Sequence, residues 1–458
     1  MTVLLFILGV LFVAIGIIVS IALHEVGHLV PAKLFKVRVT QYMVGFGRTL
    51  WSTKKGDTEY GIKAIPAGGF VAMIGMYPPN KTDGSVRPSS TGLLQTLAES
   101  RAEPRKAGRL EKLAADARDM AHEEVGPEDE NRVFYKLPVW KKIIIMLGGP
   151  AMNFVIAIVL MAVVLMGFGI AQPTTTLAEV NACQVKYGEQ PPADLSNCTP
   201  TPAAAAGLKP GDKIVSFDGK QPASWDELSA WIKADAGRNV PITVERGGQS
   251  VSLSITPVLT ARPVVNAAGV AEKDANGGVL TQEVGFAGIS PASANVPQPV
   301  TAVLPAVGDN IAAVAGVVVN LPQRMVAVAQ AAFSSAPRDP NGPVSVVGVG
   351  RVAGELAATE QVPLSARIAA LISLIAGVNI ALGVFNLIPL LPLDGGHVAG
   401  ALYEGARRRI AKWFGRKDPG PFDIAKLLPL TYVVASVLLV MGALLIYADI
   451  VKPVNLFG

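Results

Sequence analysis

The sequence predicts a polytopic α-helical membrane protein with four transmembrane helices, a membrane-associated β-region and an extracytoplasmic α+β domain. Half of its 458 residues are apolar and only 16% are charged, and the mean hydropathy is +0.42, which is too apolar for an ordinary soluble enzyme. A net charge of +5 is small for a nucleic-acid-binding or disordered chain of this length, so we expect no nucleic-acid partner. Two cysteines exclude a disulfide-dense scaffold and a four-cysteine zinc site.

Four apolar runs can cross a bilayer core of about 30 Å, which needs about 20 helical residues. With their flanks, they predict transmembrane helices at 1–30, 141–170, 366–400 and 428–450. The first run has no basic residues before it and is longer than the core of a signal peptide, so we expect it to stay as a span rather than be cleaved. A fifth stretch, 311–321, is short and is followed by Pro322, and we interpret it as an amphipathic helix outside the membrane.

Basic residues predict the orientation. Residues 31–142 contain 19 of the 40 lysines and arginines and residues 402–428 contain 7, whereas the longer stretch 168–367 contains 13. Loops rich in lysine and arginine face the cytoplasm. We therefore expect residues 401–427 to form a basic cytoplasmic loop, residues 171–365 to be extracytoplasmic, and both termini to be extracytoplasmic.

Both cysteines fall in the predicted extracytoplasmic region. Cys183 and Cys198 have fourteen residues between them. An oxidising compartment favours a disulfide there, which would stabilise the outer domain by about 3 kcal/mol. Two free thiols are the alternative.

The first cytoplasmic loop divides into two parts. Residues 31–79 contain glycines among clustered and alternating apolar residues, which is typical of β-hairpins, either associated with the membrane or simply cytoplasmic. Residues 80–135 form a charged cytoplasmic insertion to which we assign no chemistry. It includes a possible short helix at 110–121, and His122 among acidic residues is expected to be a surface histidine.

The outer region contains one further recognisable pattern. Residues 206–212 read AGLKPGD, and a strand, a helix at 225–234 and a hairpin between 240 and 255 follow. This order resembles a PDZ domain, so we expect an extracytoplasmic PDZ-like domain at 171–295, with 284–289 as a further strand. PDZ domains bind peptide ends by adding a strand, although this one could also act only as a spacer. Residues 296–365 are expected to form an extracytoplasmic helical linker.

Residues 24–28, at the inner end of the first span, read HEVGH. His24 and His28 are four residues apart, so on an α-helix their side chains share one face and can reach a single ion, with Glu25 beside it. Ionisable and metal-binding groups at a membrane edge are costly unless they are paired or coordinated. The motif therefore predicts a functional metal site rather than a chance pair on a helix surface.

A catalytic zinc ion takes three protein ligands and leaves one position for water. Asp394, at the inner end of the third span, lies at the depth of the HEVGH motif and is the predicted third ligand. Pro389 and Pro392 should break the helix just before it. His397 is the competing candidate, and an aspartate that only ends the helix is the alternative.

With HEVGH in the first span and NLIPLLPLDGG at 386–396, the chain resembles the site-2 protease family of intramembrane zinc metalloproteases, in particular its bacterial branch with a PDZ domain between spans two and three, the regulator of sigma-E protease type. Further matching positions are Gly149, Pro150 and Asn153 in span two. The insertion at 80–135 and the single PDZ-like domain depart from some members of the family.

The resemblance implies a mechanism. Zinc would be held by His24, His28 and Asp394, and Glu25 would be the catalytic general base. Asn386 resembles a family asparagine that contacts the substrate backbone, whereas Asn379 is interpreted mainly as a helix-packing amide. The unwound substrate would be held by the β-region, for which the candidate substrate-binding residues are Gly45, Phe46, Gly47, Gly68 and Gly69.

The resemblance also implies partners and location. Expected substrates are single-span membrane proteins such as anti-sigma factors, already shortened by a site-1 protease, or leftover signal peptides. The protein would lie in the bacterial plasma (inner) membrane, in contact with membrane lipid, with its active site near the cytoplasmic face. A catalytically inactive PDZ-containing scaffold and an ion transporter are the alternatives, but the intact HExxH with Asp394 argues against the first, and the absence of a sequence repeat argues against the second.

Overall fold

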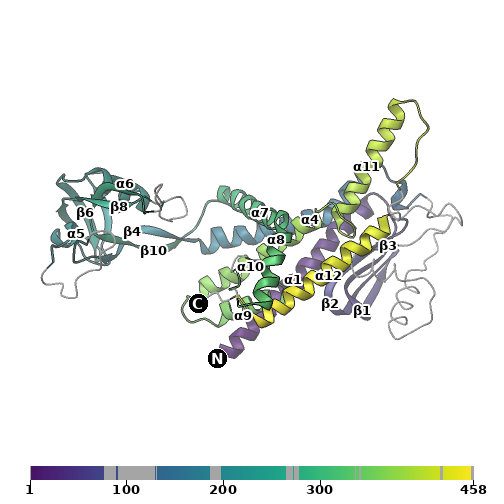
Figure 1. Cartoon of the computed structure of the whole chain (residues 1–458), viewed down its shortest axis with the longest axis horizontal. Coiled ribbons are helices and arrows are strands. Elements are labelled where there is room, and N and C mark those ends of the chain that lie inside the picture. Colours follow the sequence, from purple (N-terminus) through teal and green to yellow (C-terminus); the bar gives the residue numbers. More distant parts are fainter. Residues whose placement is uncertain are drawn as a thin grey trace. The chain divides into compact units, whose positions relative to one another are not determined.

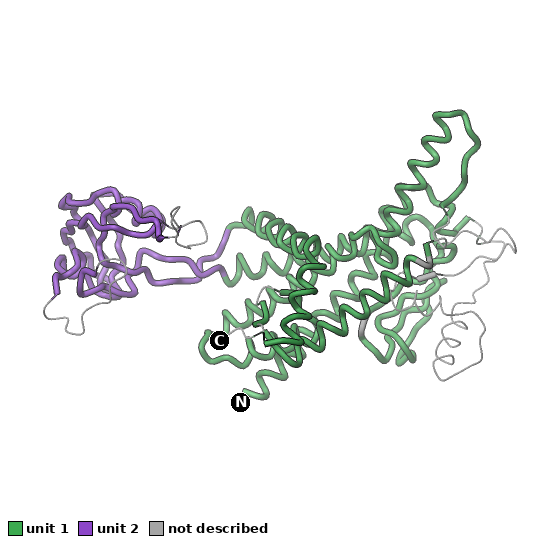
Figure 2. Tube along the Cα trace, viewed as in Figure 1, with its two compact units in different colours: residues 1–168, 299–458 green, residues 169–298 purple. Residues whose placement is uncertain are grey.

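The computed structural model describes residues 2–76, 89–90, 129, 131–185, 198–264, 272, 278–335, 337–339, 342–422 and 427–454. The chain divides into two compact units, one formed by residues Met1–Phe168 with Pro299–Gly458 and the other by Gly169–Gln298 (Figure 2). Most of the 80–135 insertion, with the predicted helix at 110–121 and His122, lies outside the described residues.

Unit 1 is built on long apolar helices (Figure 1). Five described helices are long and apolar enough to cross a membrane, one more than predicted. They are α1 (Thr2–Leu34), α4 (Val139–Ala162) with its π-helical extension η3 (Val163–Phe168), α7 (Val303–Val319), α10 (Leu364–Asn386) and α12 (Leu428–Val451).

The additional candidate, α7, includes most of the stretch at 311–321 that the sequence predicted as a short amphipathic helix. The helix begins earlier than expected, at Val303, and includes Asp309 and Asn310; Pro305 is tolerated in its first turn, where the missing N–H of proline breaks no helical hydrogen bond. Val303 and Val307 of α7 pack with Ala157 of α4 and Ile380 of α10. This helix is therefore part of the helical unit.

The helices α1, α4 and α10 pack closely enough to position side chains between them. At Gly27 of α1 and Gly148 of α4, a Cβ on either residue would overlap the carbonyl group of the other, so the two backbones are in contact. Nearer the start of α1, Ile17 packs in the cluster that includes Leu160, nearer the end of α4, so the two helices are antiparallel. On the other side, Asn379 of α10 donates to Ser20 Oγ of α1 at 2.9 Å.

Residues 296–365 are largely helical, as predicted. They contain η5 (Val300–Ala302), α7, α8 (Leu321–Phe333) and α9 (Val346–Ala358). Helix α9 packs on the first half of α1, where Gly9 lies against Ala353. Arg338 and Asp449 form a buried ion pair at 2.5 Å, which fixes the segment between α8 and α9 to the end of α12.

The predicted third span is two helices in the structure. The first, α10, ends at Asn386, and α11 (Asp394–Trp413) begins after a turn that contains Pro389 and Pro392. Asp394 is thus in the first turn of a new helix rather than at the end of the span, and much of the region predicted as a loop at 401–427 is helical. In the α4–α11 interface, buried Lys142 and Glu404 form an ion pair at 2.9 Å.

The predicted β-hairpin is present between α1 and α4. Strands β1 (Val39–Lys55) and β2 (Thr58–Met73) are antiparallel, and the short strand β3 (Ser89–Ser90) pairs with the end of β2. Tyr42 of β1 pairs with both Tyr60 and Val71, so the first half of β1 lies between the two halves of β2. Tyr42 also donates to the carbonyl of Ala22 in α1 at 2.8 Å, which fixes the sheet beside the HEVGH motif.

Unit 2 has the predicted order of strand, helix and hairpin. Its main sheet runs β10-β4-β5-β6-β7, and β8 pairs separately with β9. The elements are β4 (Ile170–Val180), α5 (Pro202–Ala205), β5 (Lys213–Phe217), α6 (Trp225–Ala234), β6 (Val240–Arg246), β7 (Gln249–Ile255), β8 (Val258–Pro263), β9 (Thr281–Phe286) and β10 (Ile289–Val296).

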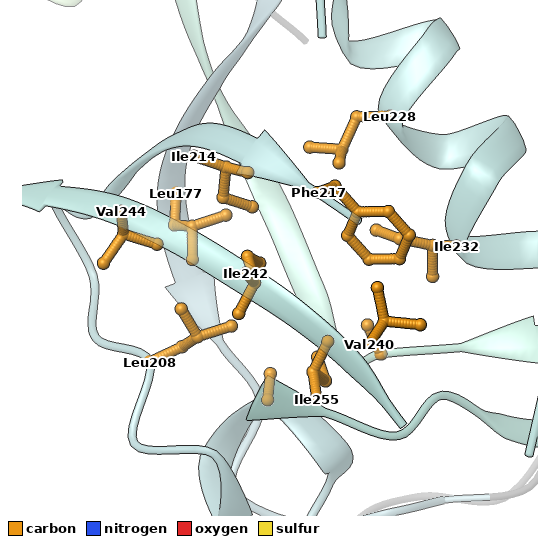
Figure 3. Packing of buried hydrophobic residues seen from close by; sticks show 12 residues of the cluster. Leu177, Leu208, Ile214, Phe217, Leu228, Ile232, Val240, Ile242, Val244 and Ile255 are labelled. Atoms are coloured by element: carbon orange, nitrogen blue, oxygen red, sulfur yellow. The ribbon is translucent and has the colours of Figure 1, made fainter. Parts of the chain in front are cut away.

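The core of unit 2 lies between the sheet and α6. Phe217 of β5 points toward Leu228 and Ile232 of α6, and all three side chains are buried (Figure 3). The further strand predicted at 284–289 is divided, because β9 ends at Phe286 and β10 begins at Ile289. Cys183 and Cys198 form the predicted disulfide, with their Cα atoms 5.5 Å apart.

The AGLKPGD turn of unit 2 is held by Asp212, which is 1% exposed. Arg246 donates to both of its carboxylate oxygens at 2.7 Å, and the backbone N–H of Lys209 donates at 2.8 Å. These hydrogen bonds, the one from Arg246 first, lower the pKa of Asp212 below its ordinary value. A carboxylate that is more acidic in the folded state stabilises that state above its unfolded pKa, and this stabilisation is lost as the pH falls through the lower, folded pKa.

We therefore expect Asp212→Asn to destabilise unit 2 near neutral pH. Hydrogen bonds to a charged group contribute about 2 kcal/mol, so amide exchange in β5 and β6 of the full chain should be about 30-fold faster in the variant. At a pH below the folded pKa of Asp212 the two proteins should converge. Asp218→Asn, which changes a carboxylate paired with the largely exposed Arg238, is the matched control and should have little effect. Equal protection of wild type and Asp212→Asn at neutral pH would contradict this expectation.

Candidate metal centre

Helix α1 carries the HEVGH motif near its C-terminal end, and α11 supplies Asp394 in its first turn. His24 Nε2 and His28 Nε2 each lie 3.4 Å from Asp394 Oδ2. The two Nε2 atoms are 3.3 Å from each other. Among the described residues, these are the three that combine as a group able to hold a metal ion.

The three side chains are shielded from solvent. The side chain of His28 is fully buried, that of Asp394 is 6% exposed and that of His24 is 12% exposed. His28 Nδ1 lies 2.8 Å from the carbonyl oxygen of Ile145 in α4. This carbonyl can only accept, so Nδ1 carries the proton and Nε2 keeps its lone pair for a metal.

The donor set fits zinc. Two neutral imidazole nitrogens and one carboxylate oxygen are zinc ligands, and tetrahedral bonds of about 2.0–2.1 Å place ligand atoms about 3.3 Å apart. The observed spacings of 3.3 and 3.4 Å agree with that value. Three protein ligands leave a fourth position for water, which is the arrangement of a catalytic rather than a structural zinc site.

Gly149 of α4 lies directly against both imidazole rings. A Cβ on this residue would lie 2.7 Å from His24 Nε2 and closer still to His28 Nε2. Any side chain here would displace the rings. In the sequence, Gly149 was noted only as a position that matches the family. The structure gives a steric reason for a glycine there.

Glu25 is 5% exposed and lies next to the β-sheet. A Cβ on Gly69 of β2 would come within 2.8 Å of Glu25 Cγ. Phe46 stacks on Phe70 with ring centroids 6.4 Å apart, and its ring also covers Gly68, which has a φ of +141° that favours glycine. Of the predicted β-region residues, Gly69 therefore lies beside Glu25 and Gly68 lies against Phe46, whereas Gly45 and Gly47 lie against Ile65 of β2.

The remaining predicted residues lie further along the chain. Asn386 is the last residue of α10 and is partly buried. His397 is 7% exposed but does not belong to the three-residue group. Asn379 is buried and packs α10 against α1 through its hydrogen bond to Ser20, as interpreted.

Two groups that support the site were missed in the sequence analysis. The first is the main-chain carbonyl of Ile145, for which a sequence carries no signal because every residue has one. The second is Ser20, one helical turn before His24, and its signal was available: it is the polar exception in the apolar run of the first span.

Comparison with known proteins decides the family. The model of Peptidase family M50 matches residues 12–417. The chain belongs to this family. The chain is 32% identical to the zinc metalloprotease Rip1 of Mycobacterium tuberculosis over 99% of each chain. It is 28% identical to the metalloprotease MmpA of Caulobacter vibrioides over 85% of each chain. It is 26% identical to the regulator of sigma-W protease RasP of Bacillus subtilis, over 84% of this chain and 87% of RasP.

This member of family M50 is a multi-pass membrane protein and an intramembrane zinc metalloprotease, which hydrolyses peptide bonds within the transmembrane segments of other membrane proteins. The resemblance noted in the sequence is thereby confirmed, as are the enzyme class and the zinc cofactor. The scaffold and transporter alternatives are set aside.

Proposed function

We propose that His24, His28 and Asp394 are the zinc ligands of this protease and that Glu25 is its general base. The convergence of two Nε2 atoms and one carboxylate oxygen within 3.3 to 3.4 Å carries the proposal. The arrangement also supports Asp394 over His397 as the third ligand.

When bound, zinc polarises the scissile carbonyl group and lowers the pKa of water to about 7. Glu25 takes the proton of the attacking water and passes it to the leaving amine. Because Glu25 is only 5% exposed, bulk water has little access to its carboxylate during this proton transfer. Asn386, at the end of α10, contacts the substrate backbone near the developing oxyanion.

A transmembrane helix hides its peptide groups in its own hydrogen bonds, so the substrate must unwind before hydrolysis. We propose that the unwound segment adds as a strand beside Gly68 and Gly69, with Gly45, Phe46 and Gly47 forming the adjoining surface. The close approach of Gly69 to Glu25 supports this placement, because a strand bound there runs past the general base.

We propose four membrane crossings, by α1, α4, α10 and α12. Gly16 of α1 lies against Ile375 of α10, and four residues later Ser20 is bonded to Asn379, so α10 is parallel to α1. Because α4 is antiparallel to α1, α10 starts at the membrane face where α4 ends. If α7 crossed once, the chain would have to cross back before α10. Helices α8 and α9 have 13 residues each, roughly 20 Å, which is too short for a bilayer core of about 30 Å.

The distribution of lysine and arginine orients these crossings. It supports a cytoplasmic β-region and α11, an active site near the cytoplasmic face, and extracytoplasmic termini in a bacterial plasma membrane. The disulfide supports an extracytoplasmic unit 2. We propose that unit 2 is a PDZ-like domain that excludes substrates with large ectodomains.

For the substrates, we propose single-span membrane proteins of the anti-sigma factor type, trimmed first by a site-1 protease, or leftover signal peptides. The name of RasP, a regulator of sigma-W, supports a role in transcriptional signalling.

The ligand set is tested by zinc content. We expect His24→Ala, His28→Ala and Asp394→Ala each to purify folded but with zinc affinity lowered at least about 100-fold, because removal of a ligand costs more than loss of its supporting partner. His397→Ala is the matched control and should keep its zinc. Retention of zinc by Asp394→Ala, with loss in His397→Ala, would transfer the third ligand to His397.

A further inference from the structure

Three side chains near the metal site carry buried polar atoms that have no hydrogen-bond partner. In the described part of the chain, Asn153 of α4 is fully buried and neither its Oδ1 nor its Nδ2 has a hydrogen bond. His24 Nδ1 and Asn379 Oδ1 are also buried and unpartnered. Buried polar atoms without partners are rare in proteins, because each costs about 1–3 kcal/mol. Four such atoms on α1, α4 and α10 therefore need an explanation.

These atoms lie in the same part of the helix bundle. Ile145, Gly149 and Asn153 are four residues apart and share one face of α4. The carbonyl of Ile145 partners His28, and Gly149 lies against both rings. Because α1 and α4 are antiparallel, the next turn of α4, with Asn153, comes beside the part of α1 that carries His24 and Ser20. Ser20 in turn receives the hydrogen bond of Asn379.

The donors and acceptors of the three residues are complementary. His24 needs a proton on Nδ1 so that Nε2 is free for the metal, and this N–H needs an acceptor. Asn153 Oδ1 is an acceptor and Asn153 Nδ2 is a donor, while Asn379 Oδ1 is an acceptor. One arrangement satisfies all four: His24 Nδ1–H donates to Asn153 Oδ1, and Asn153 Nδ2 donates to Asn379 Oδ1, directly or through one ordered water.

We propose that Asn153 is a positioning residue, which fixes the tautomer and orientation of His24 and links it to Asn379. It does for His24 what the carbonyl of Ile145 does for His28. The proposal rests on the assignment of His24 as a zinc ligand and deepens it. Partners of metal-bound histidines typically account for 10- to 100-fold in metal affinity.

The test compares Asn153→Leu, which keeps the branched shape of the side chain and removes the amide, with Asn153→Asp, which keeps an oxygen acceptor. We expect Asn153→Leu to bind zinc 10- to 100-fold more weakly in chelator competition, and Asn153→Asp to remain within about threefold of wild type. Because the chain has 4 histidines, ¹⁵N-histidine labelling resolves their ring N–H groups. The His24 Nδ1–H signal should lose its protection from exchange in Asn153→Leu only.

The His28 Nδ1–H, bonded to Ile145, reports whether each variant is folded and should be unchanged throughout. Wild-type zinc affinity in Asn153→Leu, or an equal loss in Asn153→Asp, would overturn the role of Asn153. A His24→Ala variant that still binds zinc with wild-type affinity would instead overturn the ligand assignment itself, so the two failures are distinguishable.

Discussion

Glu25→Gln should abolish proteolysis while leaving zinc bound. The amide has the shape of the carboxylate but cannot accept a proton, and general bases contribute about 10²- to 10⁴-fold to the rate. Glu25 is not one of the three residues whose ligand atoms converge, so its replacement leaves the donor set intact. The measurement is cleavage of a tagged single-span substrate in liposomes, together with the zinc content of the same preparation.

Asp394→Asn is the informative comparison, because it should lose both zinc and cleavage. A neutral amide oxygen is a much poorer zinc ligand than a carboxylate. Two phenotypes are therefore expected from two neighbouring acids: one inactive protein with metal and one inactive protein without. Cleavage by Glu25→Gln at more than a tenth of the wild-type rate would show that another group accepts the proton.

The sequence alone predicts much of this division between zinc ligands and general base. The spacing of His24 and His28 follows from helical periodicity alone, and the structure confirms that both face one point. The hairpin around Gly45 and Gly69 was also predictable, because glycines within alternating apolar residues favour strands over helices.

The limits of sequence reasoning appear where tertiary contacts decide. Pro389 and Pro392 break the helix before Asp394 as predicted, but the aspartate begins a new helix, α11, which was not predicted and near whose N-terminus a negative charge is favourable. Helix α7 was predicted too short at its start, because the polar residues Asp309 and Asn310 that precede the predicted stretch lie inside the helix. Local patterns do not reveal which residue of one helix faces which residue of another.

The polar residues inside the spans illustrate the same limit. Ser20 and Asn379 are 359 positions apart, and only the packing of α1 on α10 shows that they form a hydrogen bond. Likewise, Gly149 reads in the sequence as a small residue in a transmembrane helix. Its contact with both imidazole rings appears only when α1 and α4 are brought together.

That contact leads to the second large expected effect. Gly149→Ala adds a single methyl group, yet we expect it to lower zinc affinity by about 100-fold or more and to abolish cleavage. The new Cβ would overlap His28 Nε2 and lie 2.7 Å from His24 Nε2, so at least one ring must rotate away from the metal position. Withdrawal of α4 from α1 would relieve the overlap, but it would open the close backbone packing of Gly27 and Gly148 one residue away and is therefore costly.

The matched control is Gly377→Ala in α10. It makes the same chemical change inside an apolar helix that is long enough to cross a membrane, but its Cβ would meet no described atom within 4 Å beyond its own helix. Alanine is the better helix former by about 1 kcal/mol, so this variant should bind zinc and cleave substrate like wild type. Zinc titration and cleavage of both variants separate steric displacement of the ligands from a general effect of alanine in the spans. If Gly149→Ala bound zinc as tightly as Gly377→Ala, the close packing of α4 on the two histidines would not be needed for the metal centre.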